Sequence, residues 1–128
     1  MKSRILAITA VACAALPAQQ AAKQDIAPAI QGAWSLSLPN GAKRIKFIAD
    51  GQWTITQADP ATGAVVFHHG GTYTLDGGTY IEKVEFANSS TTGLIGKEHK
   101  FELTIEGDVI HQKGIGNPWT EDWKRINP

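Results

Sequence analysis

A carboxylate on an otherwise apolar strand face is the clearest candidate for chemistry in this sequence. In the segment TYIEKVEFA (79–87), alternation places Tyr80, Glu82, Val84 and Phe86 on one face of a predicted strand. A desolvated carboxylate must be paired, hydrogen-bonded or protonated. Glu82 is therefore the leading site residue, either as a binder of a polar ligand group or as a general base. The alternative is a rim position at which it meets a lysine, an arginine or water.

Two histidines are candidates for the same interior. His99 shares a predicted strand face with Phe101 and Leu103, and a tight turn at EGD (106–108) is expected to set His111 opposite Leu103 on that face. The two imidazoles would then lie roughly 13 Å apart, too far to share a metal ion. The sequence also has no His-x-His or His-Glu-x-x-His spacing. We expect no metal and no other cofactor, and the histidines either line a pocket or make structural hydrogen bonds.

Aromatic side chains complete the candidate pocket. Tyr73 and Tyr80 each lie in a GTY triplet and carry a hydroxyl, and Trp53 shares a face with Ile55. Each of these side chains could equally be ordinary core packing. The predicted ligand-binding residues are Trp53, Tyr73, Tyr80, Glu82, His99 and His111.

Short alternating segments separated by glycine turns must position these residues. The predicted strands are 33–38, 43–49, 52–57, 64–69, 71–75, 79–87, 98–105, 109–113 and 119–126. Asn-Gly and Asp-Gly pairs in the connections favour tight hairpins. Such a chain folds as a sandwich or closes into a barrel, and closure removes exposed sheet edges. We predict an all-β fold, a single antiparallel up-and-down barrel of eight or nine strands.

Alternation also predicts which residues face inward. In strand 98–105 the inner face carries His99 and its apolar neighbours, and in strand 52–57 it carries Trp53. Strand 43–49 offers Ile45 and Phe47 as its inner face, with Arg44 and Lys46 opposite.

The first strand opens with Gly32-Ala33-Trp34, and the last contains Arg125 in WKRI. The pair resembles the Gly-x-Trp and late arginine of lipocalins and the wider calycin barrels. The resemblance implies that Trp34 closes one end of the barrel while Arg125 crosses its ring, a cation–π clasp between first and last strands.

More narrowly, the chain resembles small exported lipocalin-like proteins of bacteria, many of them domains of unknown function. The motifs that carry the resemblance are GAWSL, KFIADGQW, GGTYTLDGGTYIEKVEF, GKEHKFELTIEGDVI and WKRI. Their order covers nearly all of the chain from residue 31 onward. The family resemblance implies a barrel interior that holds a small molecule.

The N-terminal segment is of a different kind. Lys2 and Arg4 precede a short apolar run and an alanine-rich exit, the pattern of a secretory signal peptide. We predict a signal peptide over 1–22, a flexible tether over 23–30 and a lipocalin-like barrel domain over 31–128, exported to the periplasm or secreted. An alternative interpretation makes AVAC a lipobox with a lipid anchor at Cys13.

Composition narrows the class of partner. Twelve Lys and Arg balance twelve Asp and Glu, and no basic stripe is present, so we do not expect nucleic-acid binding. The single cysteine lies within the predicted signal peptide, so the mature domain has no disulfide. No run beyond residue 22 is apolar enough to be a transmembrane segment, and the oligomeric state stays open.

Three functions compete at this point. The first is an exported protein that binds a small, partly apolar ligand in the barrel. The second is a barrel enzyme, of isomerase or cyclase type, with Glu82 as general base. The third is a filled barrel that acts through its surface as an envelope interaction module. The first is the prediction we favour, and it rests on resemblance of fold.

Overall fold

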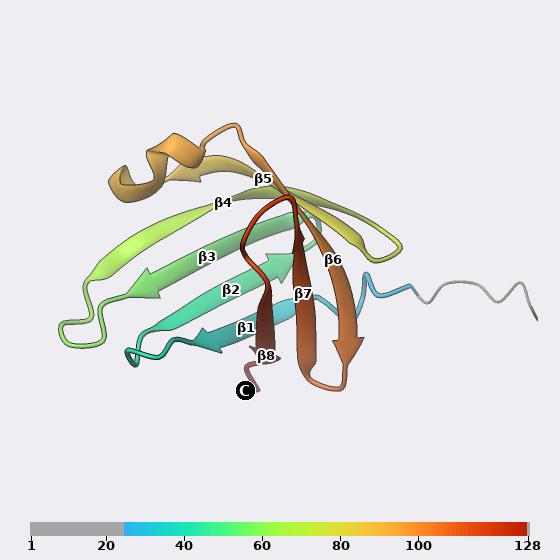
Figure 1. Cartoon of the computed structure of the whole chain (residues 1–128), viewed down its shortest axis with the longest axis horizontal. Helices are drawn as coiled ribbons and strands as arrows, with labels where there is room; N and C mark the ends of the chain where they lie inside the picture. Colours follow the sequence, from blue (N-terminus) through green and yellow to red (C-terminus); the bar gives the residue numbers. More distant parts are fainter. Residues whose placement is uncertain (1–24, 128) are drawn as a thin grey trace, which may run out of the picture.

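The computed structural model describes residues 25–127, which form one closed antiparallel barrel (Figure 1). Its eight strands follow one another in sequence order, and β1 pairs with β8 to close the cylinder. The strands are β1 (Gly32–Ser37), β2 (Lys43–Ala49), β3 (Gln52–Ala58), β4 (Val65–Asp76), β5 (Thr79–Ala87), β6 (Glu98–Glu106), β7 (Val109–Ile115) and β8 (Glu121–Arg125). The predicted all-β up-and-down barrel is confirmed, with eight strands.

The hairpins follow from their turn residues. Asp50 and Gly51, between β2 and β3, both have positive φ, at 44° and 83°. A two-residue turn of this kind matches the right-handed twist of paired strands, and Asp-Gly is one of the pairs that adopt it most easily. This turn sets the β2–β3 register, in which Lys46 lies opposite Ile55.

The closing seam is built around Trp34 and Arg125, which are directly paired between β1 and β8. The guanidinium lies 4.3 Å from the centroid of the buried indole ring. Its two terminal nitrogens also donate to the carbonyl oxygens of Gln31, at 2.9 Å, and Ala29, at 2.7 Å. Gly32 has a φ of +125°, and a Cβ there would lie 3.0 Å from the Arg125 guanidinium. A glycine two residues before the tryptophan therefore leaves room for the arginine.

Residues 25–30 pack against this end of the barrel. Ile26 and Ile30 belong to the buried core, and the Ile30 carbonyl accepts a hydrogen bond from the Trp34 indole at 2.9 Å. The prediction of a flexible tether reaching residue 30 is wrong for this part, because both isoleucines bury apolar surface against the barrel. The predicted signal peptide and Cys13 lie outside the described residues.

The inward faces of β3 and β6 are as predicted, but that of β2 is reversed. Lys46 is 3% exposed inside the barrel, whereas Phe47 is 53% exposed on the outer surface. The apolar-inside rule fails here because the lysine has a buried partner, described below, that offsets its desolvation.

A second correction concerns β5, where Val84 points inward but Phe86 is 44% exposed. The β4–β5 register shifts between Gly70 and Gly71, so that Gly70 pairs with Phe86 and Gly71 with Val84. The extra residue of this β-bulge reverses the alternation beyond it. Both glycines are needed, because a Cβ on either would collide with neighbouring backbone.

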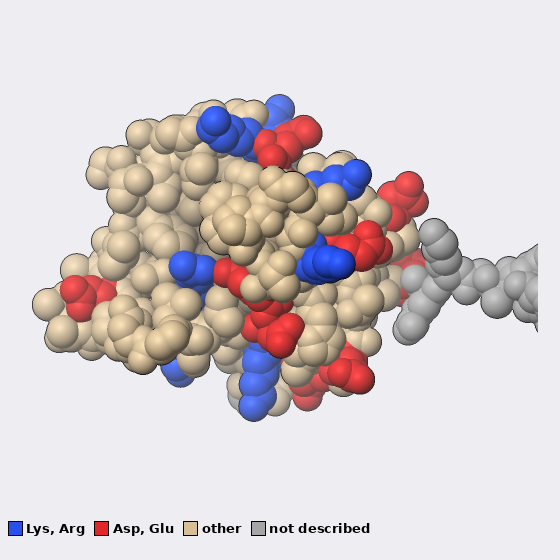
Figure 2. All heavy atoms as spheres, viewed as in Figure 1, with Lys and Arg blue, Asp and Glu red and all other residues tan. Residues whose placement is uncertain are grey.

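A short 3₁₀ segment, η2 (Ser89–Leu94), follows β5 at the end of the barrel opposite residues 25–30 (Figure 1). Acidic and basic side chains are interspersed on the face shown in Figure 2. Within residues 25–127, none of the helical segments has the length and apolar character needed to cross a bilayer.

Candidate ligand-binding site

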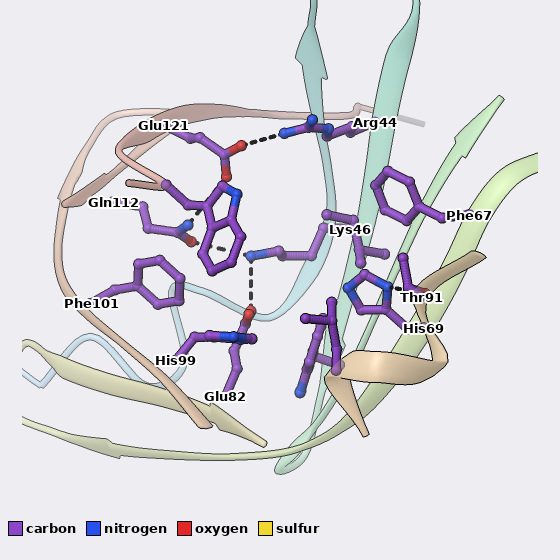
Figure 3. Close-up of a pocket in the computed structure, with 14 residues that line it drawn as sticks. Arg44, Lys46, Phe67, His69, Glu82, Thr91, His99, Phe101, Gln112 and Glu121 are labelled. Carbon is purple, nitrogen blue, oxygen red and sulfur yellow. Dashed lines mark hydrogen bonds and ion pairs between the residues drawn. The ribbon is translucent and has the colours of Figure 1, made fainter. Parts of the chain in front are cut away.

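A cavity of about 190 Å³ lies inside the barrel, toward the end at which β2, β4, β6 and β8 begin (Figure 3). It is thus at the opposite end from the Trp34–Arg125 clasp. Its lining combines apolar, uncharged polar and charged side chains. These are Trp53, Ile55, Phe67, Leu94, Phe101 and Trp119; His69, Thr91, His99 and Gln112; and Arg44, Lys46, Glu82 and Glu121.

A buried ion pair forms the floor of the cavity. The Lys46 ammonium on β2 lies 2.9 Å from Oε2 of Glu82 on β5, and the two residues are 3% and 5% exposed. The ammonium also donates to Oε1 of Gln112 at 3.1 Å, and the hydroxyl of Tyr80 donates to the same Oε2 of Glu82 at 3.0 Å. The pair therefore has the additional hydrogen bonds that buried charges need.

Aromatic rings surround the same ammonium. Its nitrogen lies 4.7 Å from the centroid of the Trp123 ring, 5.8 Å from that of Tyr80 and 6.0 Å from that of Trp53. Ring faces attract a cation, most strongly where water is excluded. The position of Lys46 inside the barrel is thus supported by one carboxylate, one amide and three aromatic rings.

A polar band continues from the ion pair through β7 and β8 and returns to β2. Gln112 on β7 donates to Glu121 at 3.3 Å, and the Glu121 carboxylate lies 2.6 Å from a terminal nitrogen of Arg44. The Nε of Arg44 donates to Gln57 at 2.8 Å. The four charged residues of the lining thus form two ion pairs whose formal charges cancel.

Two imidazoles face the cavity from β4 and β6, the strands on either side of β5. His69 on β4 stacks on Phe67, with ring centroids 5.2 Å apart, and its Nδ1 lies 3.1 Å from the hydroxyl of Thr91 on η2. His99 on β6 meets the ring of Trp119 edge-on, with centroids 4.8 Å apart. Burial lowers the pKa of His69 and of His99 below 6.5, although the Glu82 carboxylate partly opposes this. Both rings are therefore uncharged at neutral pH.

Three of the six predicted ligand-binding residues line the cavity: Trp53, Glu82 and His99. Tyr80 is fully buried beneath the cavity and holds Glu82, and burial together with the nearby carboxylate raises its pKa well above 10. Tyr73 packs against Tyr80, with the two rings tilted by 41°, and accepts a hydrogen bond from Gln31 at 3.0 Å. The two tyrosines thus support the floor from the side of the clasp.

The prediction that His111 faces the interior is wrong. Glu106 pairs with Val109, so the turn contains only Gly107 and Asp108 and His111 lies opposite Thr104 rather than Leu103. The shift of one residue moves the side chain to the outer face. There its nitrogens lie 2.8 Å from Asp122 and 3.1 Å from Glu106, and these hydrogen bonds raise the pKa of the imidazole.

Sequence reasoning missed the cation that pairs with Glu82. The available signal was that a buried carboxylate needs a partner. The segment KRIKFIA (43–49) has an isoleucine on each face, however, so its alternation does not show which lysine or arginine points inward. Gln112, Arg44, Glu121 and His69 were likewise not identified as lining residues. Across residues 25–127, no three His, Asp or Glu side chains are arranged to hold a metal ion.

Comparisons of the chain with models of protein families, with curated proteins and with solved structures find no match. The structure establishes the closed eight-stranded barrel. Kinship with the lipocalin-like proteins stays a prediction from the sequence motifs.

Proposed function

We propose that this barrel is an exported, lipocalin-like protein that binds one small, partly apolar molecule in its interior cavity. The observation that carries the proposal is the make-up of the cavity. Six apolar side chains contact the space, while the charged side chains beside it are already paired with one another. Apolar walls with a few placed polar groups are typical of small-molecule sites.

The size of the cavity limits the ligand. Pockets for drug-sized molecules enclose roughly 300–1,000 Å³, and this cavity encloses about 190 Å³. The half of the barrel nearer the Trp34–Arg125 clasp is filled by the core around Trp34 and Trp123, both almost fully buried. The space therefore suits a molecule smaller than most drugs, of the size of a single substituted ring.

The state of Glu82 favours binding over catalysis. Its Oε2 accepts hydrogen bonds from both Lys46 and Tyr80. A general base must take up a substrate proton, and protonation of Glu82 would leave the buried Lys46 ammonium without its counter-ion. The cavity likewise supports a pocket more than it supports the hypothesis of a filled barrel that acts through its surface.

Export belongs to the same proposal. The pattern of residues 1–22 supports delivery to the periplasm or to the medium by a cleaved signal peptide. Intact mass of the protein isolated from its host tests this directly. We expect the mass of a chain whose first residue follows residue 22 or lies shortly before it. A mass that corresponds to a chain still carrying Met1 contradicts export by cleavage.

Binding is tested by NMR titration of the isotope-labelled protein with toluene and with phenol, two single-ring probes that differ in one group. We expect at least one probe to shift the indole N–H signals of Trp53 and Trp119, which line the cavity. Leu94→Trp fills the cavity and should abolish the shifts, whereas Ile95→Trp, at the exposed neighbour, should not. Absence of binding by both probes contradicts the proposal.

A further inference from the structure

Glu82 presents one carboxylate oxygen that has no partner. Both of its hydrogen bonds, from Lys46 and from Tyr80, are made by Oε2. Among residues 25–127, nothing donates to Oε1, and this atom retains access to the cavity that Glu82 lines. A carboxylate oxygen only accepts hydrogen bonds. The floor of the cavity thus has a strong hydrogen-bond acceptor that a ligand can pair with.

The charges around this acceptor leave no place for a second ion. Lys46 neutralises Glu82, and Arg44 on β2 neutralises Glu121 on β8. His69 and His99 carry no charge at neutral pH, for the reason given above. A charged ligand would bring an unpaired charge into a space whose own charges already cancel, and burial of an unpaired charge at low dielectric is costly.

Rings line the cavity on both sides of Glu82. Figure 3 shows Phe67 and His69 on one wall, Phe101 and His99 on the other, and the Glu82 side chain rising between them. Facing aromatic walls favour a flat ring, through stacked or edge-on contacts. The ligand that satisfies these surroundings is flat, uncharged and able to donate one hydrogen bond.

We propose that the cavity selects a small uncharged aromatic molecule carrying a hydroxyl or N–H group, which it donates to Oε1 of Glu82. This inference rests on the proposed function and specifies its ligand class. Lys46 and Tyr80 act as positioning residues, because they fix the carboxylate through its other oxygen. Glu82 is the residue that determines specificity.

The wild-type protein tests the ligand class without any substitution. Phenol and toluene have nearly the same shape, but toluene is the more apolar and gains more by leaving water. Tighter binding of phenol therefore marks a hydrogen bond, and a bond to a charged acceptor predicts a preference of about tenfold or more. Benzoate and benzylamine, the charged relatives, should bind several-fold more weakly than phenol.

The outcomes separate the two proposals. If toluene binds as well as phenol, the cavity binds small molecules but Glu82 does not select a donor, and only this inference is overturned. Tighter binding of benzoate or benzylamine than of phenol overturns the inference in the same way. If neither phenol nor toluene binds, both proposals are overturned.

A charge-free variant tests the role of Glu82 itself. Glu82→Gln alone leaves Lys46 without its counter-ion, so it can impair folding. The double variant Lys46→Met, Glu82→Leu removes both charges and keeps the volume, and its fold is checked by circular dichroism. We expect it to bind toluene as the wild type does and to lose the preference for phenol. A preference for phenol that survives in this variant contradicts the assignment.

Discussion

At the residue scale, the unusual feature is a lysine inside a barrel of only about a hundred residues. Lys46 and Glu82 are both almost fully buried, and each has at least one further polar partner. Burial of a single charge costs several kcal/mol unless it is paired. The pair is therefore better regarded as a means of fixing the Glu82 carboxylate at the cavity floor than as a source of stability.

Loss of one partner should be costly. Lys46→Met leaves the Glu82 carboxylate buried without a counter-ion, and we expect the free energy of unfolding to fall by about 3 kcal/mol. Lys100→Met, at an exposed position on β6, should change it by less than about 0.5 kcal/mol. Urea denaturation measures both values. A Lys46→Met protein as stable as the wild type would show that the pair does not exist in solution.

The histidines predict how stability depends on pH. The pKa of His69 and of His99 is lower in the folded protein than the ordinary value of 6.5, so the unfolded chain binds protons first as the pH falls. Their stabilisation is therefore present above pH 6.5 and is lost as the pH falls toward the lower values of the folded state. His111 has a raised pKa and behaves oppositely. Its contribution to stability is complete below pH 6.5 and is lost as the pH rises through the raised pKa of the folded state.

Urea titrations between about pH 7.5 and about pH 5 test these signs. Replacement of His69 by Gln should make the decline in stability toward acid shallower. Replacement of His111 by Gln should make the decline steeper, because the compensating group is removed. Equal slopes in the wild type and both variants would show that these pKa shifts are absent.

At the element scale, the fold depends on how β1 meets β8. Arg125 contacts the Trp34 ring and two backbone carbonyls of the preceding turn, and thereby joins the last strand, the first strand and residues 25–31. Only four residues pair across this seam, two on each strand. A side-chain clasp therefore supplements a short ladder.

Removal of the clasp should weaken this seam. Arg125→Ala is expected to lower the free energy of unfolding by about 2–3 kcal/mol, from the loss of charge-assisted hydrogen bonds and of the cation–π contact. Lys124→Ala, at the exposed neighbouring position, serves as the matched control. Hydrogen exchange should also accelerate in β1 and β8 of the Arg125 variant before the other strands. Uniform exchange in the two variants would contradict a local role.

The bulge between β4 and β5 offers another test at this scale. A Cβ at Gly71 would collide with the backbone of Lys83, whereas Gly93 on η2 has open space around it. Gly71→Ala should therefore cost about 2 kcal/mol or more, while Gly93→Ala should be nearly neutral. Thermal unfolding compares the two alanine variants, and equal midpoints would show that the bulge tolerates a side chain.

The alternation of residues along the strands predicted most of the fold, and the positions at which this prediction failed have local causes. Trp53, Phe101 and Leu103 lie inward as their spacing predicts. His111 faces outward because the turn between β6 and β7 has two residues instead of the three of EGD (106–108). Phe86 faces outward because a bulge adds one residue to β5. Neither effect is visible in a single sequence, since both depend on which residues pair across strands.

At the scale of the whole molecule, the barrel divides into two halves with different roles. One end is closed by Trp34, Ile30 and Arg125, and the half of the barrel next to them is packed with core side chains. The other half keeps about 190 Å³ open above the Lys46–Glu82 pair. Glu82 could be identified from the sequence because it interrupts an apolar face. Lys46 could not, because its inward position depends on a partner 36 residues away.

The most direct test of the account is an NMR measurement of contacts between phenol and the wild-type protein. We predict intermolecular nuclear Overhauser effects from the ring protons of phenol to the methyl groups of Ile55 and Leu94 and to the ring of Phe101, all of which line the cavity. Contacts confined to exposed residues such as Phe47 and Val65, or no contacts at saturating phenol, would show that the interior does not bind the molecule and would contradict the account.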